Sequence, residues 1–144
     1  MNSNHKDETP KRISPDKRLK LGKQYQQKFG KKEGVITLES GLQYEIIVAS
    51  EGRKPEIDDH IFCHYHGTTI DGVVFDSSVE RNKPETLPLS QLIEGWKQAL
   101  LMMSTGSKWR LVIPPHLAYG KQGVSKEIGA NSTLVFEVEL LGIK

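Results

Sequence analysis

Three segments of the sequence carry the side chains best suited to chemistry. They span residues 64–78, 92–96 and 114–120 and contain Tyr65, Phe75, Asp76, Trp96 and Tyr119. A Trp floor, Tyr and Phe walls and one carboxylate can form an apolar pocket that accepts a proline ring. These residue types suit a reaction that breaks no bond. We therefore interpret the segments as a peptide isomerase site before considering a hydrolase.

A different chemistry would use Cys63, His64 and His66 as a thiol nucleophile or a metal site. Successive side chains of a strand point to opposite faces, so Cys63 is expected on the face away from both histidines. Two histidines are too few donors for a closed zinc site. We therefore expect the histidines to form an exposed polar strand face.

Other reactive motifs are missing from the sequence. Ser77 and Ser78 lie beside Asp76, but no Gly-x-Ser-x-Gly turn is present to expose a nucleophilic serine. The sequence also lacks a Gly-x-x-x-x-Gly-Lys phosphate loop and a dinucleotide fingerprint. We therefore expect no cofactor and no metal.

Length and composition fit one soluble domain. A chain of 144 residues with 36% hydrophobic and 26% charged residues can bury a single core. No apolar run approaches the ~18 residues that span a bilayer, and the first residues lack the apolar stretch of a signal peptide. The single cysteine agrees with a reducing compartment. The sequence therefore predicts a cytoplasmic protein without membrane contact.

Charge divides the chain into two parts. Residues 1–33 hold ten Lys and Arg against four Asp and Glu, whereas residues 34–144 hold ten against fourteen. This asymmetry predicts a basic N-terminal extension attached to a mildly acidic globular domain, with the boundary at residues 33 and 34.

The extension contains one helix signal. Ser14-Pro15-Asp16 is typical of a helix start, and Gly30 is typical of a helix end. Leu21, Tyr25 and Phe29 would form a narrow apolar stripe on a helix of about residues 15–29. Residues 1–13 show no periodicity, so we expect disorder there. The helix is expected to lie exposed or to meet an acidic partner, and two turns of stripe are too short for a dimer seam, so we predict a monomer.

From residue 41 onward the hydrophobic pattern has a period of two, which indicates strands with one buried face. The alternating sets are Leu42, Tyr44 and Ile46; residues 61–67; Trp109, Leu111 and Ile113; and Leu134, Phe136, Val138 and Leu140. Asp71-Gly72 is a hairpin signal. A helix fits only residues 95–103, where Trp96, Leu100 and Met103 share one face and Gly106 would be the stop. The pattern predicts an α+β fold.

The same residues occur in a recognisable order. The motifs are Tyr65 with Gly67, Phe75-Asp76-Ser77-Ser78, Arg81, Ile93 before Gly95-Trp96, Ala118-Tyr119-Gly120, Ile128, and Thr133-Leu134-Val135-Phe136-Glu137-Val138. This set resembles the FK506-binding-protein (FKBP) family of peptidyl-prolyl cis-trans isomerases over about residues 40–144. Ser40-Gly41-Leu42-Gln43-Tyr44, Trp109 and Ile113-Pro114 look most like the bacterial branch that includes macrophage infectivity potentiator proteins. The resemblance implies an antiparallel sheet wrapped around one short helix, with residues 34–144 as the isomerase domain.

The resemblance also implies a set of site residues. Trp96 would lie under the proline ring; Tyr65, Phe75, Leu92, Ile93 and Phe136 would line the pocket; Ile128 and Tyr119 would form the rim; and Asp76, partnered by Arg81, would be the polar group. Asp76, Tyr119, Tyr65, Trp96 and Phe136 are the catalytic candidates among them, and the Tyr119 hydroxyl would bind a substrate carbonyl. The alternative is that the rings are ordinary core, Asp76 a turn residue, Tyr119 a loop anchor and Arg81 a surface charge.

The implied partners are proline-containing unfolded or loop segments of proteins. A macrolide of the FK506 or rapamycin type is a weaker expectation, because Glu85, Leu87 and Leu117 stand where small eukaryotic members carry aromatic residues. The alternative function is a non-catalytic peptide-binding chaperone module, recruited to ribosomes or nucleic acid through the basic residues 1–33.

Overall fold

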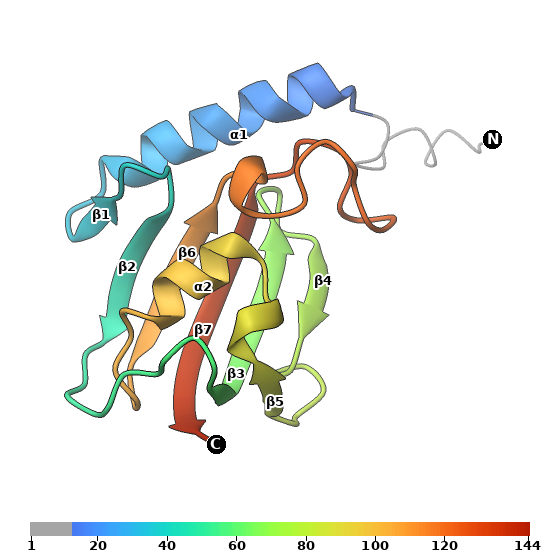
Figure 1. The fold of residues 1–144 in the computed structure, drawn as a ribbon. Coiled ribbons are helices and arrows are strands. Elements are labelled where there is room, and N and C mark those ends of the chain that lie inside the picture. The colour runs from blue at the N-terminus through green and yellow to red at the C-terminus, as the bar shows by residue number, and fades with distance from the viewer. Residues whose placement is uncertain (1–12) are drawn as a thin grey trace.

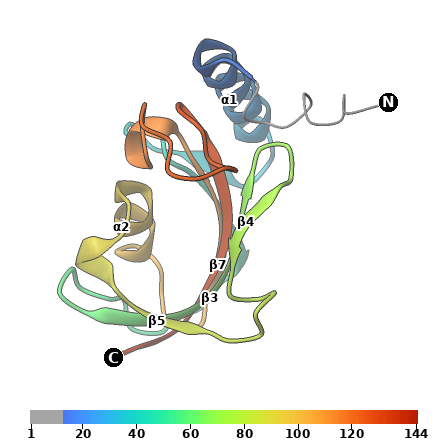
Figure 2. The same cartoon turned by 90° about the vertical axis from the view of Figure 1, so that its right-hand side faces the viewer.

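The computed structural model describes residues 13–144, which form an antiparallel sheet that curves around one helix, with a second helix across one end (Figure 1, Figure 2). The helices are α1, Pro15–Gly30, and α2, Glu94–Leu100. The strands are β1, Val35–Thr37; β2, Gln43–Val48; β3, His60–Thr69; β4, Val74–Ser77; β5, Glu85–Pro88; β6, Lys108–Ile113; and β7, Leu134–Ile143. The predicted α+β fold is confirmed. The predicted disorder falls almost entirely on residues 1–12, which lie outside the described part of the chain.

Strand order in the sheet is β1-β2-β6-β7-β3-β4, and β5 pairs with β3 beside this path. All of these strand pairs are antiparallel, and the two ten-residue strands β3 and β7 form the centre. Their register places Gly67 opposite Phe136 and Tyr65 opposite Val138. Residues that are 69 and 73 positions apart in the sequence are therefore neighbours, which is the basis of the site described below.

The faces of the central strands follow the predicted alternation. Leu134, Phe136, Val138 and Leu140 are buried on β7, as are Trp109, Leu111 and Ile113 on β6 and Ile61, Cys63 and Tyr65 on β3. These side chains pack with α2 to form the core. The Asp71-Gly72 hairpin is also confirmed: Gly72 has φ of +91°, and the Thr69 amide donates to the Val73 carbonyl oxygen at 2.9 Å.

Strand β2 departs from the expected burial. Leu42 is fully buried and Tyr44 stacks on Trp109 with 4.3 Å between ring centroids, but Ile46 is 48% exposed. The prediction that Ile46 faces the core is wrong. Strand β1 pairs only with residues 43–45 of β2, so beyond Glu45 the paired neighbour of β2 among the described strands is β6 on one side.

Helix α2 is shorter than predicted. It ends at Leu100 rather than near residue 103, because the amides of Met102 and Met103 bond to carbonyl oxygens three residues earlier and tighten the chain into a turn. Trp96, Leu100 and Met103 are nonetheless buried, as their spacing predicted. The shortened helix still presents Trp96 to the inner face of the sheet.

Helix α1 begins and ends close to the predicted positions. The Ser14 hydroxyl accepts a hydrogen bond from the Lys17 amide at 3.2 Å, and Pro15 occupies the first helical position. One face of the helix is not exposed, however, because Gly22 is buried against Thr133 of the globular part. The expectation of a fully exposed helix is wrong for that face.

Candidate active site

A cavity of about 440 Å³ opens between α2, the inner face of the sheet and the loop that precedes β7. Its lining residues are Tyr65, Phe75, Asp76, Leu87, Gln91, Leu92, Ile93, Trp96, Tyr119, Val124, Ser125, Ile128 and Phe136. Every predicted site residue except Arg81 is among them. The fold therefore brings the three sequence segments to one cavity.

The floor of the cavity consists of aromatic rings packed edge to face. Trp96 lies 5.4 Å from Tyr65 and 5.3 Å from Phe136, measured between ring centroids, and the interplanar angles are 84° and 89°. Phe75 meets Phe136 in the same way at 5.4 Å. Such pairs are favourable because the positive edge of one ring meets the negative face of the next. The rings are therefore held in fixed orientations around an apolar hollow.

The sheet and α2 position these rings. Tyr65 lies on β3, Phe75 on β4 and Phe136 on β7, so the three side chains project from adjacent strands. Trp96 lies in the first turn of α2, whose neighbouring Gly95 meets the sheet so closely that a Cβ there would be 2.6 Å from a methyl carbon of Ile113. The absence of a side chain at residue 95 allows α2 to bring Trp96 down to the strands.

One carboxylate lies at the edge of the aromatic set. Asp76 accepts hydrogen bonds from the Tyr65 hydroxyl at 3.0 Å and from the Arg81 guanidinium at 2.7 Å. Arg81 also donates to the Tyr65 hydroxyl at 3.0 Å and to Glu85 at 3.3 Å. Arg81 thus lies outside the cavity and orients two residues that line it. These side-chain contacts agree with the predicted Arg81–Asp76 pair rather than with Asp76 as a simple turn residue.

Burial, hydrogen bonding and nearby charge shift the pKa values of Tyr65, Arg81 and Tyr119. Burial raises the pKa of Tyr65, and the bonds to Asp76 and Tyr65 raise the pKa of Arg81. Tyr119, which is 38% exposed at the rim, has a raised pKa for two reasons, namely burial and the nearby charge of Asp76. Both tyrosines therefore keep their hydroxyl protons at neutral pH and can donate hydrogen bonds.

Four lining residues are absent from the predicted set: Leu87, Gln91, Val124 and Ser125. Leu87 lies on β5 and was identified in the sequence only as a departure from aromatic residues. Gln91 ends a short 3-10 helix of residues 89–91, and Val124 and Ser125 lie in a loop, so no periodicity indicates which way these side chains point. Leu117, by contrast, is buried in the core, so its replacement of an aromatic residue does not change the rim.

The histidine and cysteine cluster has a structural role in the described chain. Cys63 is fully buried, and burial, with a smaller effect of Glu85, raises the pKa of its thiol to about 12. His64 pairs with the Ser78 hydroxyl at 2.6 Å and His66 with the Ser77 hydroxyl at 2.8 Å. The predicted exposed histidine face is half-buried instead, because Ser77 and Ser78 at the end of β4 pack over it. Within residues 13–144, no group of three His, Cys, Asp or Glu side chains is arranged to hold a metal ion.

Two family models match successive segments of the chain. The family model described as FKBP-type peptidyl-prolyl cis-trans isomerase matches residues 51–141, and the model for the domain amino-terminal to such isomerases matches residues 2–46. The FKBP-type 22 kDa peptidyl-prolyl cis-trans isomerase of Escherichia coli K12 is 51% identical over 122 residues, covering 85% of this chain and 59% of that protein. The outer membrane protein MIP of Legionella longbeachae is 47% identical over 113 residues, covering 78% and 48%.

Solved structures give the same result. FkpA from Escherichia coli superposes with a TM-score of 0.87 at 45% identity, covering 90% of this chain and 61% of that chain. A peptidyl-prolyl cis-trans isomerase from Pseudomonas syringae pv. tomato superposes with a TM-score of 0.84 at 34% identity, covering 92% and 97%. The present chain spans about half to three fifths of the length of the two curated relatives.

Proposed function

This chain belongs to the family of FKBP-type peptidyl-prolyl cis-trans isomerases, and we propose that it accelerates rotation about Xaa-Pro bonds in protein substrates. The observation that carries the proposal is the cavity over Trp96, whose edge-to-face rings enclose an apolar hollow next to a single hydrogen-bonded carboxylate. A proline ring is apolar and compact, and it is the group that such a hollow accommodates.

The physical basis is the electronic structure of the amide bond. Resonance keeps the Xaa-Pro bond planar and imposes a rotational barrier of roughly 18–20 kcal/mol. The planar state is more charge-separated than the twisted state, so an apolar pocket disfavours it relative to the transition state. Lowering the barrier by ~5 kcal/mol through preferential binding of the twisted bond gives about four decades of rate. Neither a nucleophile nor a metal takes part.

Each residue has a proposed role in this reaction. Trp96 supports the proline ring, and Tyr65, Phe75, Leu92, Ile93, Ile128 and Phe136 enclose it. Tyr119 donates its hydroxyl proton to a substrate carbonyl, and its raised pKa supports this role because the proton is retained at neutral pH. Asp76, oriented by Arg81, provides the negative charge at the pocket edge. An FK506-like or rapamycin-like macrolide would occupy the same cavity.

A proline-peptide isomerisation assay on the folded chain tests the proposal. We expect Trp96→Leu and Asp76→Ala to lower kcat/KM by about 10-fold or more, because each removes a contact to the bound proline segment. Trp109→Leu is the matched control: Trp109 is also a buried Trp but stacks on Tyr44 away from the cavity, so its kcat/KM is expected to stay within about twofold. No acceleration by the folded wild-type chain above the uncatalysed rate would exclude the proposed function.

The names of the relatives, which are peptidyl-prolyl cis-trans isomerases, favour catalysis over the alternative of a non-catalytic chaperone module. A measurement of client aggregation distinguishes the two functions. If Trp96→Leu loses isomerase activity but still suppresses aggregation as the wild type does, peptide holding is a separate property of the chain.

Cellular location and the partner of the basic helix remain proposals. Across residues 13–144 the helices are too short or too polar to span a bilayer. The cytoplasmic location gains no support from the relatives, one of which is named an outer membrane protein. Contact with nucleic acid or ribosomes is supported by the exposed lysines of α1, including Lys17, Lys20 and Lys23. RNA binding that weakens with salt and disappears when these lysines are replaced is the expected result.

A further inference from the structure

The rim of the cavity is built by a single loop, residues 118–131, which we call the rim loop. It supplies Tyr119, Val124, Ser125 and Ile128 to the cavity lining. The loop is tied together internally, since the Val124 amide donates to the Ile128 carbonyl oxygen at 3.0 Å and the Ile128 amide donates to the Ser125 hydroxyl at 3.1 Å. These hydrogen bonds fix the shape of the loop tip, residues 124–128. The position of the lining side chains therefore depends on how the base of the loop, residues 129–131, is held.

The base of the rim loop is bound by the first turns of α1. Arg18 donates from one guanidinium nitrogen to the Ala130 carbonyl oxygen at 2.7 Å, and the Asn131 side chain donates to the Pro15 carbonyl oxygen at 3.2 Å. The guanidinium lies so close to Gly129 that a Cβ there would be 2.8 Å from its central carbon. These three contacted residues follow directly after Ile128.

Helix α1 is itself fixed on the globular part. A Cβ at Gly22 would lie 2.2 Å from the Thr133 hydroxyl, so the helix backbone packs directly on the start of β7. Further along, Gln26 donates to the Gly41 carbonyl oxygen at 2.9 Å, and Gln43 donates to the Gln26 carbonyl oxygen at 2.9 Å. Figure 1 and Figure 2 show the helix lying across the end of the sheet, beside the rim loop. Its N-terminal end therefore has a fixed position relative to the cavity.

We propose that Arg18 is a positioning residue that sets the substrate affinity of the cavity by holding the rim loop against α1. The inference rests on the proposed isomerase function. Arg18 does not line the cavity, and the aromatic floor comes from β3, β4, β7 and α2. Tyr119 is anchored independently of Arg18, because the amides of Ala118 and Gly120 on either side of it donate to the Pro115 carbonyl oxygen at 2.9 Å. Loss of the Arg18 contact therefore releases the rim residues beyond Gly120 while leaving Tyr119 and the floor in place, and it changes KM rather than kcat.

Arg18→Ala in the full chain tests the proposal. We expect KM for a Xaa-Pro peptide to rise about 3- to 10-fold, with kcat within about twofold, because the charge-assisted hydrogen bond to the rim loop is lost. Amide hydrogen exchange in residues 120–131 is expected to accelerate while exchange in β3 and β7 is unchanged. Arg18→Lys keeps one donor for the Ala130 carbonyl oxygen and is expected to restore part of the affinity.

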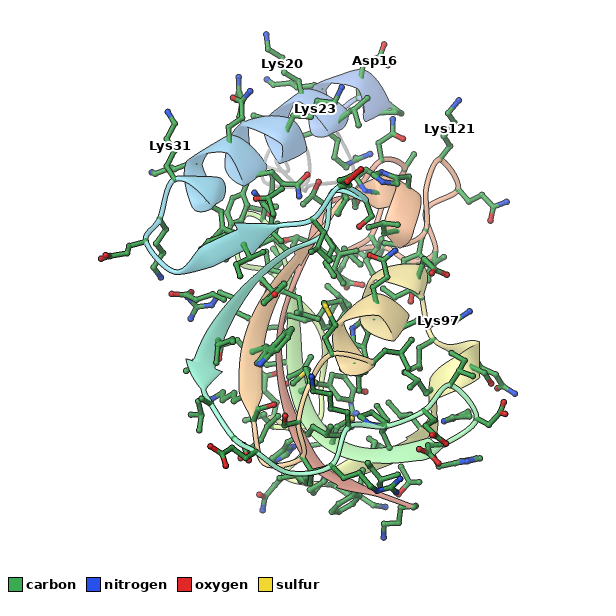
Figure 3. The ribbon with its side chains drawn as sticks, turned by 60° about the vertical axis from the view of Figure 1, so that its left-hand side comes forward. Asp16, Lys20, Lys23, Lys31, Lys97 and Lys121 are labelled. Carbon is green, nitrogen blue, oxygen red and sulfur yellow. The ribbon has the colours of Figure 1, made fainter. Side chains whose placement is uncertain are left out.

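Two further variants separate positioning from charge. Gly22→Leu forces α1 away from Thr133 without removing a charge, and it is expected to raise KM and rim exchange in the same direction as Arg18→Ala. Lys20→Ala removes one positive charge from the same helix, and its side chain points away from the globular part (Figure 3). The Lys20→Ala variant is expected to behave as the wild type in both measurements.

The outcomes that overturn the inference differ from those that overturn the function. If the wild type is active but Arg18→Ala shows unchanged KM and unchanged amide hydrogen exchange in residues 120–131, the inference is overturned and the proposed function is not. Equal effects of Lys20→Ala and Arg18→Ala also overturn it, because net charge would then be the cause. An inactive wild type overturns the proposed function, whereas calorimetric titration with the proline peptide and the exchange measurement still decide whether Arg18 controls the rim.

Discussion

At the scale of single residues, Gly67 is a position where the pocket tolerates little change. It lies on β3 opposite Phe136, and two pocket rings occupy the space that a side chain would need. A Cβ at this position would lie 2.7 Å from Phe136 and 2.9 Å from Phe75. Overpacking of this kind forces side chains out of their preferred rotamers. The glycine is therefore required by the close approach of the rings rather than by an unusual backbone angle.

Gly67→Ala is accordingly predicted to destabilise the fold by about 1–3 kcal/mol and to lower isomerase activity, because Phe75 and Phe136 must shift. Urea unfolding and the peptide assay measure the two effects. Gly142→Ala on the neighbouring strand β7 is the control, since the nearest atom to a Cβ there is 4.0 Å away. A Gly67→Ala variant as stable and active as Gly142→Ala would contradict this account of the pocket.

The tyrosine hydroxyls lead to a prediction about pH. Burial raises the pKa values of Tyr65 and Tyr119 above the ordinary value of 10.0. A raised pKa means that the folded state favours the protonated form, so this contribution is present below the ordinary value and is lost as pH rises through the folded value. We predict that kcat/KM stays level through the neutral and mildly alkaline range and falls only above 10. A tyrosine titration below pH 10 in the activity profile would refute the assignment of these donors.

At the scale of elements, one ion-pair network joins three adjacent strands. Arg110 on β6 donates to Glu137 on β7 at 2.5 Å and to Glu45 on β2 at 3.3 Å. The register places the three residues side by side across the outer part of the sheet. The hydrogen bond from Arg110 lowers the pKa of Glu137 below its ordinary value of 4.5. The Arg110–Glu137 ion pair therefore stabilises the pairing of β6 and β7 only while Glu137 is ionised.

Glu137→Gln is predicted to reduce the free energy of unfolding at pH 7 by less than ~1 kcal/mol, because the pair is partly exposed to solvent. The sign of the pH effect follows from the lowered pKa: the contribution is present above 4.5 and is lost as pH falls through the folded value. The wild type should therefore lose more stability than Glu137→Gln between pH 5 and strongly acidic pH. Parallel acid dependence of the two proteins in urea unfolding would count against the network.

At the scale of the whole molecule, the two faces of α1 bear on whether two copies of the chain can pair. Its predicted apolar stripe does not form a free seam: Leu21 and Tyr25 line a hollow between the helix and the β3–β4 hairpin of the same chain. The outward face carries Lys20, Lys23 and Lys31, and Figure 3 shows Lys20 and Lys31 pointing away from the sheet. Like charges on that face oppose the pairing of two copies through α1.

We therefore predict that the 144-residue chain is a monomer with a molar mass of 16.2 kDa in light scattering over a wide concentration range. High ionic strength is the demanding condition, because repulsion between the lysine faces is most screened there. A mass of twice this value that does not vary with concentration would show a stable dimer and refute the prediction.

The local sequence pattern alone determined several elements of the fold and the types of side chain around the cavity. The period-two burial of β3, β6 and β7, the capped start of α1 and the ring types around Trp96 are all encoded within short stretches. A side chain on a strand has only two faces to choose from, and a helix start needs only its own first turn. The family motifs could be recognised for the same reason, since each is a short segment.

Tertiary structure alone decided the remaining features. Ile46 alternates as a core residue does, but it is 48% exposed, at the end of β2 that β1 does not reach. The half-buried histidines, the lining residue Ser125 and the contact of Arg18 with Ala130 all depend on segments that meet only in the folded chain. Periodicity specifies which side chains share a face, whereas the neighbour that covers the face comes from a distant part of the sequence.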